Sequence, residues 1–243
     1  MAGSQKPPRR FAPLKGGESD APKLQGIVFD MDGTLCEPQT QMFKDMRSAL
    51  SVPPTTDILT HISTLPLPSQ PEAHSTLRDI ETRYMHLQRP QPGLQPLMDY
   101  LDSRSVRKAI WTRNWDRPVQ SLLDRFLQGR DFVVVTREWG GEPKPGPAGM
   151  FSIAEGWGLR KEEGGKVDAT GLIMVGDSMD DMLGGRNAGA ATVLLLNEHN
   201  ADVAGSGMVD LVIEQLDELI RVLEEGFVGI GDGVEDGAEA DEA

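Results

Sequence analysis

One short stretch constrains this chain more than any other: residues 26–34, with the sequence GIVFDMDGT. Residues 27–29 are β-branched or aromatic with no polar side chain between them, which predicts a short buried strand. Asp30 and Asp32 end this strand, and Gly33 follows at once for a tight turn. Like charges this close repel each other, so a divalent cation that prefers carboxylate oxygens is the candidate to compensate them. The calcium-loop pattern does not fit, because Gly33 directly follows Asp32 and a strand precedes the acids.

Strand-like and helix-like segments alternate along most of the remaining chain. Apolar segments typical of buried strands lie at residues 106–112, 132–135, 172–176 and 192–196, with an edge strand expected at 210–213. Segments of helical periodicity separate them. This alternation predicts an α/β fold in which a parallel sheet carries helices on both faces.

A helical insert interrupts the alternation after the first strand. Residues 39–50 and 71–88 each carry an apolar stripe at helical spacing, and a short helix is expected between them. The two ends of the chain are rich in Gly, Pro or charge and lack apolar periodicity, which predicts disorder. We therefore expect a disordered leader (1–23), an α/β core (24–36 and 90–225), a helical cap (37–89) and a disordered acidic tail (226–243).

The composition argues against two classes of binding partner. The net charge of -14 and the pI near 4.7 argue against sequence-independent binding of nucleic acid or of an anionic membrane surface. No apolar run approaches the roughly 18 residues of a membrane span. The one cysteine, Cys36, excludes a disulfide within the chain and favours a reducing compartment, so we expect a cytoplasmic protein.

Three more segments place polar residues at strand ends or in the loops after strands. Thr112 closes an apolar strand, and Lys144 begins the sequence Lys-Pro-Gly-Pro. The strand at 172–176 runs into Asp177, with a further acid, Asp181, four residues later. Because ligands of open parallel sheets bind beyond the carboxyl ends of the strands, we expect these side chains to share one crevice with Asp30.

These four segments, in this order, resemble the motifs of the haloacid dehalogenase-like (HAD) hydrolase superfamily. The resemblance spans roughly residues 24–197 and implies a Rossmann-like sheet. The insert resembles the small helical cap of the branch that includes phosphoglycolate phosphatases and β-phosphoglucomutase. Asp32 speaks against the dehalogenases of the superfamily, whose first motif lacks the second Asp.

The resemblance implies a role for each motif residue. Asp30 would be the nucleophile that forms an aspartyl-phosphate, and Asp32 the general acid and base. Lys144 would keep Asp30 ionised and steady the phosphoryl oxygens. The remaining roles are Mg²⁺ ligation by Asp30, Asp177 and the backbone carbonyl of Asp32; phosphate binding by Thr112, Lys144 and the backbone around Arg113; and support from Asp181 and Asn114.

The favoured function is a magnesium-dependent phosphatase that acts on a small phosphorylated metabolite. Two alternatives stay open: a phosphomutase of the same superfamily, which would keep every motif, and a non-catalytic binding or scaffold protein. The sequence identifies neither the substrate nor the oligomeric state, although a monomer is favoured.

Overall fold

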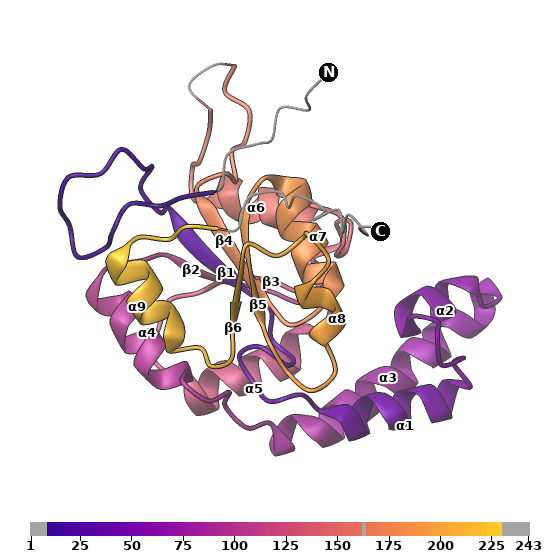
Figure 1. The fold of residues 1–243 in the computed structure, drawn as a ribbon. Helices are drawn as coiled ribbons and strands as arrows, with labels where there is room; N and C mark the ends of the chain where they lie inside the picture. The colour runs from indigo at the N-terminus through magenta and orange to yellow at the C-terminus, as the bar shows by residue number, and fades with distance from the viewer. Residues whose placement is uncertain (1–8, 162–163, 230–243) are drawn as a thin grey trace, which may run out of the picture.

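The structure, a computed structural model, describes residues 9–161 and 164–229 (Figure 1). Within these residues, six parallel strands form one sheet in the order β3-β2-β1-β4-β5-β6. The strands are β1 (Gly26–Phe29), β2 (Lys108–Trp111), β3 (Val133–Val135), β4 (Leu172–Gly176), β5 (Ala191–Leu195) and β6 (Leu211–Ile213). The predicted Rossmann-like parallel sheet is confirmed.

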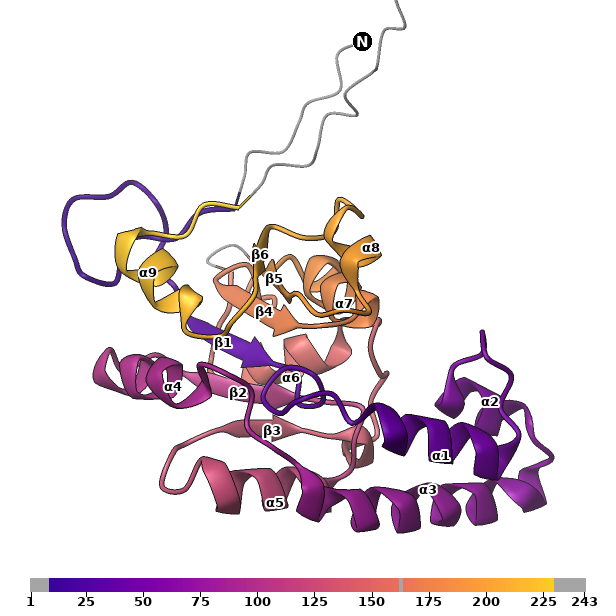
Figure 2. The ribbon, with the colours of Figure 1, turned by 60° about the horizontal axis from the view of Figure 1, so that its bottom comes forward.

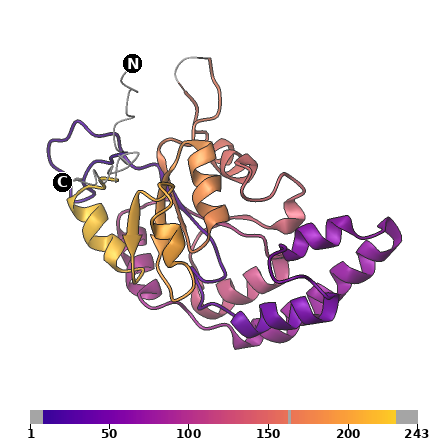
Figure 3. The same ribbon diagram turned by 45° about the vertical axis from the view of Figure 1, so that its right-hand side comes forward.

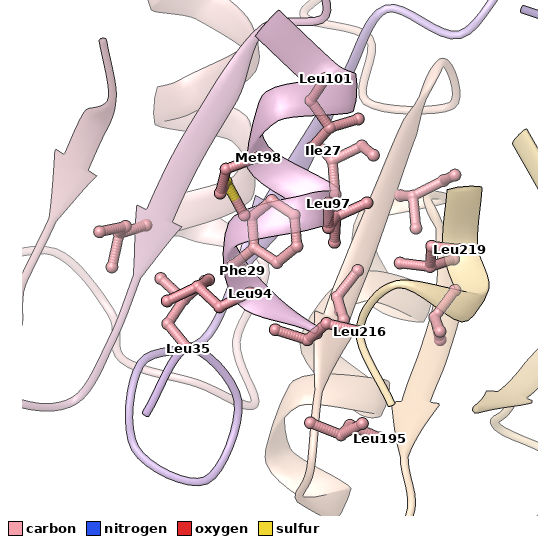
Figure 4. Close-up of a cluster of buried hydrophobic side chains, with 14 of the residues drawn as sticks. Ile27, Phe29, Leu35, Leu94, Leu97, Met98, Leu101, Leu195, Leu216 and Leu219 are labelled. Carbon is pink, nitrogen blue, oxygen red and sulfur yellow. The ribbon is translucent and has the colours of Figure 1, made fainter. Parts of the chain in front are cut away.

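Helices cover both faces of this sheet. Successive side chains of a strand point to opposite faces, so an apolar strand presents apolar side chains on both faces that have to be buried. Ile27 and Phe29 of β1 pack in the larger core cluster, whereas Val28 packs in a second cluster on the other face. Figure 4 shows Ile27 and Phe29 among leucines of the covering helices. The larger cluster includes residues of α4 (Leu94–Ser103), α5 (Asp116–Phe126) and α9 (Glu218–Glu225), and the second includes residues of α6 (Ala148–Gly156) and α7 (Met179–Ala188).

The insert between β1 and β2 is helical and has a core of its own. It contains α1 (Thr40–Leu50), α2 (Ile58–Thr64), η1 (Leu67–Ser69), α3 (Gln70–Tyr84) and η2 (Met85–Leu87). Met42, Met46, Ile62 and Leu77 are buried together in this cap core. Figure 3 shows these purple helices on the opposite side of the sheet from the yellow helix α9. In the described residues, no helix is both long and apolar enough to cross a membrane.

The prediction of disorder is wrong for residues 9–23 and 226–229. Phe11 is only 3% exposed, and its ring lies 5.7 Å from that of Phe227, centroid to centroid. The backbone N–H of Phe11 donates to the Phe227 carbonyl at 2.9 Å, and the two segments run side by side (Figure 2). The contact of these two rings and the backbone hydrogen bonds hold the segments together, although neither segment shows apolar periodicity. Residues 1–8 and 230–243 of the expected leader and tail lie outside the described residues.

This packing predicts that Phe11→Ala lowers the melting temperature. Truncating a buried phenylalanine removes apolar contact and leaves a cavity, so we expect a loss of about 3 kcal/mol in the free energy of unfolding. Leu67→Ala is the control, because Leu67 is 80% exposed and its truncation should cost less than about 0.5 kcal/mol. Chemical denaturation of both variants measures the difference; equal stabilities would show that the N-terminal segment adds nothing to the core.

Candidate active site

The carboxyl ends of three neighbouring strands converge at the centre of the sheet. β1 lies between β2 and β4, with Phe29 in register with Ile110 on one side and Val175 on the other. Asp30 follows β1, Thr112 follows β2 and Asp177 follows β4. The three polar side chains predicted to share a crevice therefore follow adjacent strands.

The turn after Asp30 needs the glycine at its centre. Gly33 has a φ of +89°, a conformation that side chains with a Cβ rarely adopt. A Cβ at this position would also overlap the carboxylate of Asp177. Gly33 thus allows the first-motif loop to approach the fourth motif closely.

Lys144 lies at the centre of the acidic residues and is 4% exposed. Its Nζ is 2.5 Å from Asp30 Oδ1 and 2.6 Å from Asp181 Oδ1. The third donor goes to the Trp111 carbonyl at 2.8 Å. Burial opposes the charge of this lysine, but Asp181 and Asp30 outweigh it and raise the pKa of Lys144, which keeps the ammonium charged.

Asp181 holds the lysine in place from the start of α7. Its Oδ2 accepts from the Ser178 backbone N–H at 3.0 Å, and the Asp181 N–H donates back to Ser178 Oγ at 3.3 Å, which closes a capping box. The Ser178 hydroxyl also donates to Asp181 Oδ2, at 2.6 Å. Both carboxylate oxygens of Asp181 are therefore engaged, one by Lys144 and one by Ser178. This geometry suits the supporting role that the sequence predicts for Asp181.

Asp32 is oriented by the second motif. Asn114 Nδ2 donates to Asp32 Oδ2 at 2.9 Å, and the Asn114 backbone N–H donates to Thr112 Oγ1 at 3.0 Å. Burial raises the pKa of Asp32, with the hydrogen bond from Asn114 acting in the opposite direction. The Cys36 Sγ lies 3.8 Å from the other Asp32 oxygen, and burial raises the pKa of that thiol, so Cys36 is a buried packing residue.

Two asparagines that sequence reasoning missed hold Asp177. Asn197 Nδ2 donates to its Oδ2 at 3.1 Å, and Asn200 Nδ2 donates to its backbone carbonyl at 2.7 Å. Both follow β5, the neighbour of β4. Applying the strand-end rule to β5 as well would have identified them.

The carboxylates form a group suited to a cation. One oxygen from each of Asp30, Asp177 and Asp181 lies within 4.8 Å of the others. Burial, with Asp181 and Asp32 adding to it against Lys144, raises the pKa of Asp30 to about 7; burial, Asp181 and Asp30 raise that of Asp177 to about 8. One lysine does not balance these acids, and hard carboxylate oxygens are the ligands that Mg²⁺ prefers. Asp181 already accepts from Lys144 and Ser178. The side chains of Asp30 and Asp177 and the carbonyl of Asp32 stay the predicted ligands.

All eight predicted site residues line one cavity of about 360 Å³. They are Asp30, Asp32, Thr112, Arg113, Asn114, Lys144, Asp177 and Asp181. The cap supplies the opposite wall. A volume of this size suits a small-molecule ligand.

Comparison with known proteins identifies the family. Residues 27–195 match the haloacid dehalogenase-like hydrolase family. The chain belongs to this family. An uncharacterized hydrolase of Saccharomyces cerevisiae is 39% identical over 208 residues, which cover 83% of this chain and 91% of that protein.

Two further proteins are similar to this chain. A phosphoglycolate phosphatase of Vibrio parahaemolyticus is 28% identical over 137 residues, covering 54% of this chain and 55% of that protein. The crystal structure of a hydrolase from Pseudomonas syringae superposes with a TM-score of 0.66 at 21% identity, covering 83% of this chain and 98% of that chain. At this identity, the superposition shows the fold.

Arginines after two strands join the core of this HAD hydrolase to its cap. Arg113 donates to Asp57 Oδ1 of the cap at 2.7 Å and to Asp180 Oδ2 of α7 at 2.6 Å. Its side chain is thus paired with carboxylates, which leaves its backbone as the predicted contact to phosphate. Arg137, in η3 (Arg137–Trp139), forms two hydrogen bonds to Glu81 of α3, at 3.1 and 3.0 Å. Sequence reasoning missed Arg137, although it follows β3 by two residues.

The acidic group predicts how stability depends on pH. Because the pKa values of Asp30 and Asp177 are raised by folding, the folded protein binds more protons than the unfolded chain between about pH 4 and pH 8. The contribution of these two groups to the stability of the protein therefore falls as the pH rises. Without metal, the melting temperature should be higher at about pH 5.5 than at about pH 8, and Mg²⁺ should raise it more at the higher pH. Asp177→Asn should flatten this dependence, whereas Asp79→Asn, an exposed acid on α3, should not. An equal pH dependence of the melting temperature in wild type and Asp177→Asn would contradict a raised pKa of Asp177.

The cap contact predicts a difference between two ion pairs that both join α3 to η3. Glu81 is buried, so Glu81→Gln leaves Arg137 without its partner and should cost about 2 kcal/mol of stability. Arg78 and Glu138, 3.1 Å apart, are more exposed, and Glu138→Gln should cost less than about 1 kcal/mol. Denaturant unfolding measures both. Equal losses would mean that burial does not decide the strength of the contact.

Proposed function

We propose that this chain is a magnesium-dependent phosphatase that hydrolyses a small phosphate monoester through an aspartyl-phosphate on Asp30. The observation that carries the proposal is the ion pair between Lys144 Nζ and Asp30 Oδ1 in a cavity lined by every predicted motif residue. Membership of the HAD hydrolases and similarity to a phosphoglycolate phosphatase support it.

The first step is attack by Asp30 on phosphorus. Lys144 holds Oδ1, and no other described residue donates a hydrogen bond to this carboxylate, which leaves Oδ2 to act as nucleophile. As the bond from Oδ2 to phosphorus forms, the bond from phosphorus to the leaving oxygen breaks. The charged lysine then offsets negative charge that develops beside the carboxylate.

Asp32 moves the proton in both steps. Its raised pKa favours the protonated acid, which donates to the leaving alkoxide oxygen. The carboxylate that results then takes a proton from water, and the water oxygen attacks phosphorus and releases Asp30. Asn114 fixes Asp32 Oδ2, so that the carboxylate keeps one orientation through both transfers.

Phosphate binding falls to Thr112 and backbone donors. Thr112 Oγ1 already accepts from the Asn114 N–H, so its hydroxyl proton is available to a phosphoryl oxygen. Asp30 and Asp177, with the carbonyl of Asp32, would hold Mg²⁺, which would supply positive charge that offsets the repulsion of the two anions.

The buried free thiol of Cys36 is compatible with the expected reducing cytoplasm. The monomeric state stays a prediction.

Phosphate release tests the proposal. Wild type with Mg²⁺ should release phosphate from at least one member of a panel of phosphorylated metabolites. Asp30→Asn should be inactive because an amide oxygen is a poor nucleophile, and Asp32→Asn should lose roughly 10² to 10⁴ in rate with its proton donor. The exposed control Asp79→Asn should keep full activity.

Three other outcomes separate the alternatives. Undiminished turnover by Asp30→Asn would exclude the aspartyl-phosphate. Conversion of a sugar phosphate to its isomer without release of phosphate would favour a phosphomutase. Silence across the panel, with no Mg²⁺-dependent binding of beryllium fluoride as a mimic of the acyl phosphate, would favour a binding or scaffold protein.

A further inference from the structure

Most of the cap residues that line the active-site cavity are apolar. Six cap residues with apolar side chains line it: Met42, Phe43, Met46, Ile58, Leu59 and Leu77. Most of them also belong to the buried cap core, but Phe43 is 40% exposed although Met42, beside it on α1, is buried. A half-exposed aromatic ring in the wall of a cavity offers apolar area to a ligand.

The charges around the cavity disfavour a second anionic group on a substrate. Seven carboxylates and four cations line it, so acids exceed cations before any phosphate enters. Three of the cations are already paired: Lys144 with Asp30 and Asp181, Arg113 with Asp57 and Asp180, and Arg137 with Glu81. A bound Mg²⁺ offsets the phosphoryl group, but a carboxylate elsewhere on the substrate would meet an excess of negative charge.

Arg47 is the remaining cation of the cavity wall. Its Nη1 donates to the carbonyls of Pro53 and Thr56, at 2.9 and 2.8 Å, and so holds the turn between α1 and α2. Within the described part of the chain, no ion pair involves Arg47. Arg47 is therefore the lining residue that would attract a second anionic group of a substrate. The test below includes a variant of Arg47 for this reason.

We propose that the site selects phosphate monoesters of a neutral alcohol with an apolar face, and that Phe43 is the residue that recognises this face. This inference rests on the phosphatase function proposed above. The phosphoryl group would lie against Asp30 and Lys144 on the core side, and the leaving group against the apolar cap wall. A substrate that carries a carboxylate in addition to its phosphate, such as phosphoglycolate, is disfavoured.

Three simple phosphate esters test this selectivity with the full chain and Mg²⁺. Benzyl and ethyl phosphate both release simple alkoxides, so they differ mainly in the apolar face, whereas 2-phosphoglycolate carries a second anion. We expect kcat/KM for benzyl phosphate to exceed that for each of the others by about tenfold or more, since transition-state binding in an apolar pocket discriminates to this extent.

Variants at Phe43 locate the selectivity. Phe43→Ala should lower kcat/KM for benzyl phosphate about fivefold or more while that for ethyl phosphate changes less than about twofold, and Phe43→Leu should retain most of the preference. Trp139→Ala is the matched control. Trp139 is 43% exposed and lines an adjoining cavity of about 250 Å³, which shares Thr112, Arg113 and Lys144 with the active-site cavity but not Phe43 or Asp30. Its truncation should leave the ratio of kcat/KM between benzyl and ethyl phosphate unchanged.

Several results would overturn the proposal. Equal kcat/KM for benzyl and ethyl phosphate would remove the apolar contact, and loss of the preference in Trp139→Ala but not in Phe43→Ala would place the leaving group in the other cavity. Preference for 2-phosphoglycolate that disappears in Arg47→Ala would show that Arg47 binds a second anion. These outcomes leave the phosphatase function intact. Release from none of the three esters nor the wider panel, with no binding of beryllium fluoride, would overturn both.

Discussion

The buried ion pairs of Lys144 are the interaction on which the site depends. Two neighbouring strand ends, those of β1 and β4, bring buried acids together, and an uncompensated buried carboxylate is costly. Lys144 donates all three of its hydrogen bonds there, to Asp30, Asp181 and the Trp111 carbonyl. Burial and the neighbouring acids together raise the pKa values of Asp30 and Asp177. A cation that binds these carboxylates in the folded protein would therefore stabilise the fold.

Much of this arrangement could be predicted from the sequence because strand ends in a parallel sheet share one edge. Asp30, Thr112 and Asp177 are far apart in the chain, yet short apolar segments precede each of them. That local pattern fixes which end of the sheet they occupy, whatever the register between strands. It also explains why the residues that follow these strands line one cavity.

Features that depend on tertiary contact were not predictable in the same way. Phe11 and Phe227 lie in segments without apolar periodicity, and their contact, with backbone hydrogen bonds between the two segments and to α9, holds those segments on the core. Arg137 and Glu81 resemble ordinary surface charges until the cap brings them together. In both cases the deciding contact joins residues distant in sequence, so no local period marks it.

The two arginines after β2 and β3 show how the site divides its work between core and cap. A sequence reader places Arg113 beside the phosphate, but its guanidinium, like that of Arg137, is occupied by carboxylates of the cap. Positive charge that would otherwise serve the substrate instead fixes the cap over the strand ends. In the proposed mechanism, Lys144, the Thr112 hydroxyl, backbone N–H groups and the metal would then supply the attraction for phosphate. Because each of these would act on the phosphoryl group alone, discrimination between leaving groups would be left to the side chains of the cap.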